Sequence, residues 1–259
     1  MKYIVCYSGG ADSQVALDLA LMQYDDVEII FCDTGLEFKE TYATIEETAK
    51  YYNMDIKFLR AGKTFEEYLE SFNGLYPSMS RRWCTERLKT RPLTKYIRSL
   101  LRGGLRREAQ EKESPSGKQV PDSAIIAEID GIRRDESRWR ANRVRVEPRK
   151  GATWNQIHQV FGMTKSEIFD YIKKGGLPLN PLYEMGYSRT SCWFCPFTTQ
   201  AENALLRKTH KKLYEKAKEW ERLYGRRFNY VVEDCEKLGN FCEDPDAEKM
   251  GKPYKERSD

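Results

Sequence analysis

The chain has 259 residues, of which 40% are hydrophobic and 32% charged, so it is long enough for one α/β domain and an appendage. No apolar run approaches the length of a membrane span and no signal-peptide pattern opens the chain, so we expect a cytoplasmic protein without a membrane partner. The net charge is only +4, so total charge does not demand a nucleic-acid partner.

A glycine-rich turn near the N-terminus separates an apolar run at residues 3–6, which predicts a buried strand, from a periodic run that predicts a helix. Adjacent glycines turn backbone amides inward and the helix N-terminus adds partial positive charge, so the turn predicts a phosphate site. A plain strand-to-helix turn with a polar cap is the alternative. No lysine follows the glycines, which excludes a Walker A loop. The candidate phosphate ligands and capping groups are Ser8, Gly9, Gly10, Asp12 and Ser13.

The alternation of strand and helix continues with apolar runs at residues 27–32 and 55–59 and a helical pattern at residues 39–52. Two consecutive strand-helix-strand units predict a parallel sheet with right-handed crossovers. Ligands gather at the carboxyl ends of such strands, where the strand order reverses. The sequence Asp33, Thr34, Gly35 ends the second strand, so we expect it beside the first loop, although Asp and Gly are also common in ordinary turns.

Basic side chains surround Cys84 within residues 80–93. Nearby cations would favour the thiolate form of Cys84 over the thiol. The alternative is that these basic side chains form an ordinary solvated helix face. Residues 103–123 are rich in Gly, Ser, Pro and charge, and predict a mobile insertion or lid. A fourth strand is expected at residues 124–129.

An arginine-rich segment follows that strand. Gly131 begins it, and Arg133, Arg134 and Arg138 come just past the carboxyl end of the strand. Guanidinium groups match phosphate and sulfate oxygens bidentately, so the segment predicts an anion contact; a surface arginine run is the alternative.

The C-terminal part begins with a short helix expected at Trp154 and a capping box at residues 164–167. An amphipathic helix is expected over residues 199–223, and its basic side chains favour a solvated face over a nucleic-acid contact. We divide the chain into a nucleotide-binding domain at residues 1–150, a helical cysteine-bearing region at residues 151–230 and a charged tail at residues 231–259.

Seven cysteines are many for a reducing compartment, and an odd count scattered over a chain this long argues against a disulfide framework. Cys192 and Cys195 form a CxxC pair. With Cys84 they supply three soft ligands for an iron-sulfur cluster inside an aromatic shell. A zinc site, a redox pair and plain packing are the alternatives. Three ligands would leave one iron of a four-iron cluster open. The candidates for a fourth ligand are Cys235 and Cys242, with His210 added for zinc.

Five segments together resemble the phosphoadenosine phosphosulfate (PAPS) reductase family within the adenine-nucleotide α-hydrolase superfamily. They are the SGGxDS loop at residues 8–13, the DTG at residues 33–35, the Cys84 segment ending in Pro-Leu, the GxRxxES..R segment from Gly131 to Arg140, and the NPLY..GY run at residues 180–187. The resemblance implies a doubly wound, Rossmann-like (HUP-type) parallel sheet of five strands with a smaller, mostly helical, cysteine-bearing C-terminal region.

The resemblance also implies roles for the site residues. The first loop would hold pyrophosphate with Mg²⁺ screening its charge, while Asp33 and Thr34 would address adenosine and Gly35 would leave room for it. Arg133 and Arg138 would stabilise developing negative charge, and with Asp12 they form the expected catalytic set. Cys84, Cys192 and Cys195 would carry a 4Fe-4S cluster.

Two chemistries follow from the family. Trp83-Cys84 replaces the Cys-Cys pair of cluster-dependent reductases, and the tail lacks the Glu-Cys-Gly-x-His motif of thioredoxin-dependent ones. The segment is similar instead to the sulfur-incorporating subunit of DNA phosphorothioation systems. We therefore expect ATP cleavage between its α- and β-phosphates and sulfur transfer, with a nucleic-acid acceptor and a cysteine desulfurase or other partner protein as sulfur donor. Sulfonucleotide (APS or PAPS) reduction and a non-catalytic nucleotide-binding module are the alternatives.

Overall fold

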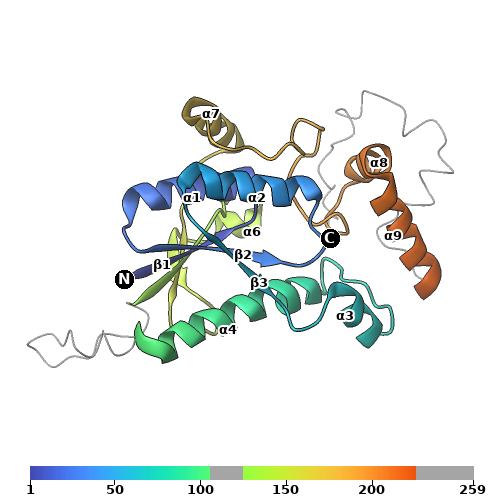
Figure 1. The fold of residues 1–259 in the computed structure, drawn as a ribbon, viewed down its shortest axis with the longest axis horizontal. Helices are drawn as coiled ribbons and strands as arrows, with labels where there is room; N and C mark the ends of the chain where they lie inside the picture. The colour runs from blue at the N-terminus through green and yellow to red at the C-terminus, as the bar shows by residue number, and fades with distance from the viewer. Residues whose placement is uncertain (106–124, 226–259) are drawn as a thin grey trace, which may run out of the picture.

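The computed structural model describes residues 1–105 and 125–225 (Figure 1). Within them lies a sheet of six strands in the order β3-β2-β1-β4-β6-β5. The strands are β1 (Lys2–Tyr7), β2 (Val27–Asp33), β3 (Ile56–Arg60), β4 (Ile126–Asp130), β5 (Val146–Pro148) and β6 (Asn155–His158). Every neighbouring pair is parallel except the edge pair of β5 and β6. The predicted doubly wound α/β fold is confirmed, and the antiparallel edge strand is the addition to the five strands expected.

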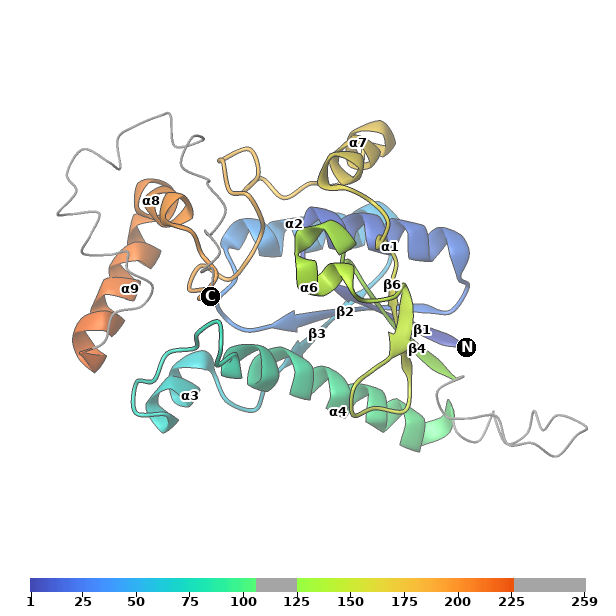
Figure 2. The ribbon, with the colours of Figure 1, turned by 180° about the vertical axis from the view of Figure 1, so that it is seen from behind.

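Helices cover both faces of the sheet (Figures 1 and 2). On one face lie α1 (Ala11–Gln23) and α2 (Lys39–Tyr52), and on the other lies α4 (Arg91–Leu100). Successive residues of a strand point to opposite faces. Accordingly Val5 packs in a cluster with Leu17, whereas its neighbour Ile4 packs in a separate cluster with Ile97.

The remaining helical elements are short or lie outside these two layers. They are α3 (Phe65–Ser71), the π-helical turns η1 (Thr85–Thr90) and η2 (Leu101–Leu105), the 3₁₀ turn η4 (Arg134–Glu136), α6 (Arg138–Ala141), α7 (Lys165–Gly175), α8 (Gln200–Thr209) and α9 (Lys211–Tyr224). The predicted capping box of α7 is present, because the Thr164 hydroxyl accepts from the Glu167 amide at 3.3 Å. No helix in the described ranges is long and apolar enough to cross a membrane.

The strand order reverses at β1, which lies between β2 and β4. The loops that leave the carboxyl ends of these three strands therefore meet at one edge of the sheet. The first is the glycine-rich turn after Tyr7, the second contains Gly35, and the third contains Gly131. The sheet thus brings together segments that are about a hundred residues apart in the chain.

The prediction of a helix at Trp154 is wrong, because β6 begins at the next residue. This strand buries Gln156 and His158, two polar residues that hide its apolar pattern in the sequence. Both side chains contact Asp130 of β4: Gln156 donates to its carboxylate at 2.5 Å, and His158 Nδ1 lies 2.8 Å from the same carboxylate. The buried His158 Nε2 has no hydrogen-bond partner within the described residues. Buried polar groups with such partners are tolerated in a core, so hydrophobic periodicity alone misses the strand.

The single helix expected over residues 199–223 is two helices, α8 and α9, separated at His210. The backbone there leaves the helical region, with φ −132° and ψ 55°. An aromatic cluster packs α9 against α3 and the CxxC segment. Its central rings are those of Phe65, Trp83, Trp193, Phe194 and Trp220.

Several predictions fall outside the described residues. These are most of the expected insertion at residues 103–123, the charged tail at residues 231–259, and the alternative ligands Cys235 and Cys242. The glycine-rich turn at residues 8–13, the arginine segment and the CxxC pair all lie within the described ranges.

Candidate active site

The glycine-rich loop is closed by one hydroxyl group. The Ser13 hydroxyl accepts hydrogen bonds from the amides of Ser8 at 3.2 Å and Gly10 at 3.3 Å, and donates to the Gly10 carbonyl at 2.9 Å. Ser13 is buried whereas Ser8 is exposed. The Ser8 hydroxyl is therefore the one presented to a ligand, and Ser13 organises the loop around the start of α1.

Both glycines of the loop are required by their surroundings. Gly9 has φ +74°, and a Cβ there would lie 2.9 Å from Cγ2 of Thr41. A Cβ on Gly10 would lie 2.5 Å from the Thr190 hydroxyl oxygen. Any side chain at either position would displace a neighbour, so the tight turn depends on glycine.

Residues from the distant NPLY segment hold the loop from the other side. The buried Asn180 amide donates to the Gly9 carbonyl at 3.1 Å and to the Thr41 hydroxyl at 3.2 Å. The Tyr183 hydroxyl accepts from the amide of Ala11, the first residue of α1, at 3.0 Å. The sequence marked this segment only by resemblance and gave Asn180 and Tyr183 no role, because each has a partner more than 170 residues away.

The arginine segment reaches the same loop. The Arg133 guanidinium Nε donates to Asp12 Oδ1 at 2.7 Å, and Arg133 also pairs with Asp135. Gly131 allows this approach, since a Cβ there would lie 2.8–2.9 Å from backbone atoms of Asp12 and Ser13. Arg138, by contrast, is an exposed residue at the start of α6.

Asp12 is the titratable group of this loop. Burial raises the pKa of Asp12 above its ordinary value, and the Arg133 guanidinium opposes that shift. The nearby carboxylate of Glu136 acts in the same direction as burial. The Arg133 guanidinium therefore balances the charge of the partly buried Asp12 carboxylate in the first turn of α1.

The DTG turn at the end of β2 is held internally. Asp33 accepts from the Tyr42 hydroxyl at 2.7 Å, from Arg60 Nε at 2.7 Å and from the Gly35 amide at 2.9 Å. Gly35 has φ +74° with open space where its Cβ would be. Asp33 thus shapes the turn, and the exposed Gly35 leaves room beside it.

The CxxC segment docks directly on this turn. The Trp193 amide donates to the Leu36 carbonyl at 2.9 Å. Cys192 Sγ lies 3.4 Å from the Thr34 hydroxyl and 3.7 Å from Glu37 Oε1, and Lys89 Nζ lies 4.0 Å from the same Glu37 oxygen. A thiol, a hydroxyl, a carboxylate and an amine therefore meet next to the DTG turn.

The three predicted ligand thiols interact electrostatically. Burial is the main cause that raises the pKa of Cys84, and the charge of Cys195 adds to it. Burial also raises the pKa of Cys192 to about 12, against the attraction of Lys89 and with a further contribution from Cys195. Cys84 thus shares a region with the CxxC pair, although about a hundred residues separate them in the chain.

The predicted ligand side chains do not form a metal-ion site in the described part of the chain. Among the described residues, no group of three or more His, Cys, Asp or Glu side chains is placed to hold a metal ion. The donor set is soft and matches an iron-sulfur cluster in kind. His210, a candidate for zinc, is engaged elsewhere: its ring lies 3.2 Å from Glu40 and 2.7 Å from the Thr209 hydroxyl.

Comparison with known proteins identifies the family. Residues 2–198 match the model of the phosphoadenosine phosphosulfate reductase domain. An uncharacterized protein of Methanocaldococcus jannaschii is 32% identical over 81% of this chain, and the match spans only 45% of that protein. An adenosine 5'-phosphosulfate reductase of Staphylococcus haemolyticus is 28% identical over 73% of the chain and 68% of the relative.

A solved structure agrees at the level of the fold. The phosphoadenylyl-sulfate reductase of Candida auris, in a phosphate complex, matches with a TM-score of 0.54 at 18% identity, over 75% of this chain and 83% of that one. The match spans less than half the length of the Methanocaldococcus jannaschii relative, at 45%, and of a second uncharacterized protein of the same organism, at 42%. Because the match covers residues 2–198, the chain belongs to the phosphoadenosine phosphosulfate reductase domain family.

Proposed function

We propose that this protein binds an adenine nucleotide at the residue 8–13 loop and cleaves ATP between its α- and β-phosphates to activate an acceptor for sulfur transfer. The observation that supports this most is the path of residues 190–192. Thr190 lies against Gly10 of the nucleotide loop, and two residues later Cys192 lies against Thr34 of the DTG turn. One short segment therefore borders both the phosphate loop and a thiol.

The phosphate groups would be held by the Ser8 hydroxyl and the partial positive charge at the start of α1. Arg133, fixed against Asp12, would balance negative charge that develops on the α-phosphate, and the exposed Arg138 would add a second guanidinium. Mg²⁺, when bound, would screen the triphosphate. Gly35 would leave space for the adenosine end beside Asp33 and Thr34.

The reaction would proceed in two balanced steps. An oxygen of the acceptor attacks the α-phosphorus of ATP, the bond to the β-phosphate oxygen breaks, and pyrophosphate leaves. A hydrosulfide-level nucleophile, supplied by a sulfur donor such as a cysteine desulfurase with a thiol reductant, then displaces AMP from the acceptor. The acceptor class we propose is a nucleic acid.

The cysteines are proposed to handle this sulfur. An iron-sulfur cluster on Cys84, Cys192 and Cys195 would supply an iron that binds sulfide. By themselves, the described side chains do not form a group that holds a metal ion. Lys89, which lies beside Cys192, would balance the charge of a sulfur nucleophile there, whereas the Glu37 carboxylate opposes that charge.

Sulfonucleotide reduction is the second candidate, and the adenosine 5'-phosphosulfate reductases among the relatives favour it. In that reaction a thiolate attacks the sulfate sulfur, the bond from that sulfur to the phosphate oxygen breaks, and AMP leaves. A second thiol then attacks the thiol-derived sulfur and releases sulfite, so the two thiols are oxidised to a disulfide. The same loop would bind the nucleotide. Sulfite would replace pyrophosphate as the product.

A product assay separates these functions. Anaerobically reconstituted protein is given labelled ATP or a labelled sulfonucleotide, with a nucleic acid and a sulfide source, and pyrophosphate and sulfite are measured. Pyrophosphate release from ATP is expected. Sulfite release without pyrophosphate would contradict the proposal in favour of reduction, and tight nucleotide binding with neither product would indicate a binding module. Iron and sulfide analysis of the same sample tests the cluster, and stoichiometric zinc without iron would exclude it.

A further inference from the structure

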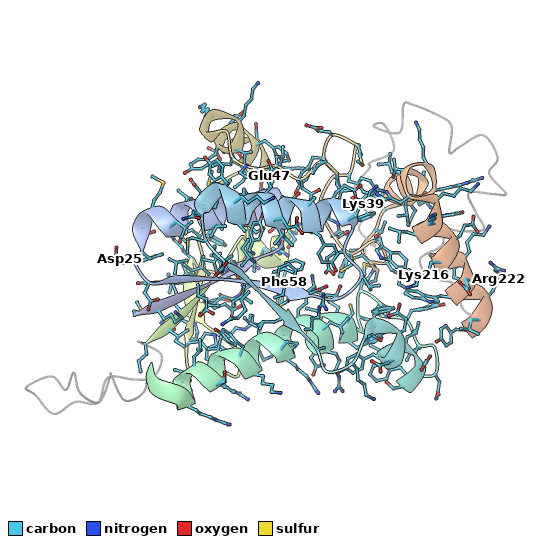
Figure 3. All side chains as sticks on the ribbon, viewed as in Figure 1. Asp25, Lys39, Glu47, Phe58, Lys216 and Arg222 are labelled. Atoms are coloured by element: carbon cyan, nitrogen blue, oxygen red, sulfur yellow. The ribbon has the colours of Figure 1, made fainter. Side chains whose placement is uncertain are left out.

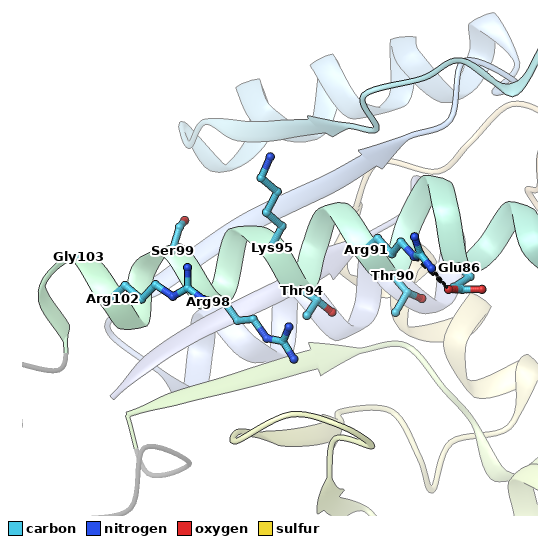
Figure 4. A pocket seen from close by; sticks show the side chains of 9 residues that line it. All are labelled: Glu86, Thr90, Arg91, Thr94, Lys95, Arg98, Ser99, Arg102 and Gly103. Carbon is cyan, nitrogen blue, oxygen red and sulfur yellow. Dashed lines mark hydrogen bonds and ion pairs between the residues drawn. The ribbon is translucent and has the colours of Figure 1, made fainter. Parts of the chain in front are cut away.

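A groove of about 630 Å³ runs along α4, on the face of the sheet opposite α1 and α2 (Figure 4). Figure 4 shows its side chains along the helix, from Glu86 at one end to Gly103 at the other. The lining consists of Glu86, Thr90, Arg91, Thr94, Lys95, Arg98, Ser99, Arg102 and Gly103. None of the residues assigned above to nucleotide or sulfur chemistry lines it.

The groove is basic along its whole length. Arg91, Lys95, Arg98 and Arg102 are exposed and follow one another at intervals of four, three and four residues, which places them on one side of a helix. Arg91 is paired with Glu86 at 2.7 Å. For the other three cations, residues 1–105 and 125–225 provide no carboxylate partner, so a row of uncompensated positive charge faces solvent.

A second segment adds to this charge. The Arg98 guanidinium donates to the carbonyl of Gly151 at 3.3 Å. The preceding residue, Lys150, is exposed and comes from the turn after β5. The basic surface therefore extends from α4 onto the neighbouring turn.

The position of the groove relates it to the cysteines. It begins at Glu86 and Thr90 on η1, the turn that also carries Lys89 and directly follows Cys84. From there α4 leads away along the sheet (Figure 2). A chain-like ligand lying in the groove would have one end next to the thiols.

We propose that this groove binds the sugar-phosphate backbone of a nucleic-acid strand and directs one nucleotide toward the Cys84 and Cys192 region. This inference rests on the proposed function, since it specifies how the acceptor reaches that site. Arg91 and Arg102 are eleven residues apart, or roughly 17 Å of helix, which corresponds to about five nucleotides of a stacked strand. Guanidinium groups bind phosphate oxygens bidentately, and the hydroxyls of Thr90, Thr94 and Ser99 are further donors in the lining.

The lining does not fit an anionic membrane. Surface-bound segments combine basic residues with an apolar face that enters the lipid. None of the large hydrophobic side chains exposed in the described residues lines the groove. A concave, polar and basic surface instead suits a flexible polyanion.

The test compares two triple variants by fluorescence anisotropy with a labelled single strand of about twelve nucleotides, as DNA and as RNA. The groove variant is Lys95→Gln/Arg98→Gln/Arg102→Gln. The matched control removes three exposed cations from the C-terminal helices, Lys208→Gln/Lys211→Gln/Lys212→Gln. The groove variant should bind about tenfold or more weakly at low salt, and its log-log salt slope should fall by about two, because each phosphate contact contributes roughly 0.7. The control should bind as the wild-type protein does.

Other outcomes would overturn the inference. Equal affinity in the groove variant and the wild-type protein, weaker binding in the control alone, or no strand binding by the wild-type protein would each exclude the groove as the site. So would binding of phosphatidylserine vesicles or polyglutamate that is lost in the groove variant while strand binding is kept. ATP affinity and pyrophosphate release are measured in parallel. Normal release with unaltered strand binding in the groove variant refutes the groove alone, whereas strand binding at the groove without pyrophosphate from any variant refutes the proposed function alone.

Discussion

At the scale of single residues, the candidate nucleotide site depends on Gly10 and Gly131. These two positions differ in the atoms that an added side chain would meet. At Gly10 the obstacle is one hydroxyl, that of Thr190, whereas at Gly131 it is backbone of Asp12 and Ser13. A threonine side chain can rotate, but a helix N-terminus cannot move without disturbing the whole loop. The two positions should therefore tolerate substitution to different degrees.

We predict that Gly10→Ala weakens ATP binding by about tenfold or more, roughly 1.4 kcal/mol, and that Gly131→Ala weakens it further. Adding Thr190→Ala to Gly10→Ala should restore part of the affinity, because it removes the nearest atom. Gly62→Ala is the control, since a Cβ there meets nothing within 4 Å. Titration calorimetry gives the affinities, and an unaltered value for Gly10→Ala would contradict the loop assignment.

Asp33 gives a prediction about pH. Burial alone would raise its pKa, but the Tyr42 hydroxyl, the Gly35 amide and Arg60 outweigh burial and hold the pKa below the ordinary 3.8. A carboxyl group whose pKa is lowered on folding stabilises the folded state fully above its unfolded pKa. That contribution is lost as the pH falls from about 4 through the folded value.

Tyr42→Phe should lower the free energy of unfolding by about 1 kcal/mol at pH 7, since it removes a hydrogen bond to a charged acceptor. The difference from the wild-type protein should shrink as the pH falls through the lowered folded pKa of Asp33, below which the carboxyl is protonated in both proteins. Tyr51→Phe on the same helix is the control, because its hydroxyl makes only a 3.4 Å contact at the surface. Urea unfolding across this pH range provides the measurement, and a difference that does not depend on pH would refute the role given to Asp33.

At the scale of elements, α8 holds the segment that leads to the CxxC pair. Its capping box joins Thr199 to Glu202, and Glu202 also accepts from the Ser188 hydroxyl at 2.6 Å. Ser188 precedes Thr190 and Cys192 by only a few residues. The helix start is therefore connected to the strip of chain that borders both the nucleotide loop and the thiols.

Glu202→Ala should reduce stability by about 1–3 kcal/mol, since it leaves buried donors without a partner, and should also speed alkylation of Cys192. Glu167→Ala removes the equivalent cap of α7, but its carboxylate is exposed. That control should cost about 1 kcal/mol or less and leave the thiol unaffected. Urea unfolding and mass spectrometry of alkylated peptides would check both, and equal alkylation rates in the two variants would separate α8 from the cysteine segment.

The sequence predicted elements well where the signal was local. The SGGxDS loop, the DTG turn and the α7 capping box each depend on neighbours within a few residues, and all three form as expected. The sequence did not predict β6, because its buried Gln156 and His158 interrupt the apolar pattern and contact the Asp130 carboxylate of β4. It also missed Thr190, because the contact with Gly10 spans about 180 residues and leaves no local pattern.

At the scale of the whole molecule, the reversal of strand order at β1 gathers the candidate site. Loops after β1, β2 and β4 meet at one edge of the sheet, and the C-terminal region covers that edge through the aromatic cluster around Trp193 and Trp220. Cys84 and Lys89 come from the segment that precedes α4, the helix on the opposite face of the sheet. The central claim is that nucleotide and thiols share this edge.

The most direct test of that claim is the rate at which N-ethylmaleimide labels Cys192, measured by mass spectrometry with and without saturating ATP. Bound nucleotide should slow the labelling about tenfold, because Thr190 and Cys192 border the loop and the DTG turn together. The protection should be smaller in Gly10→Ala at the same ATP concentration, because this variant binds ATP more weakly. Equal labelling rates with and without ATP, in wild-type protein shown by calorimetry to have bound it, would contradict a shared site.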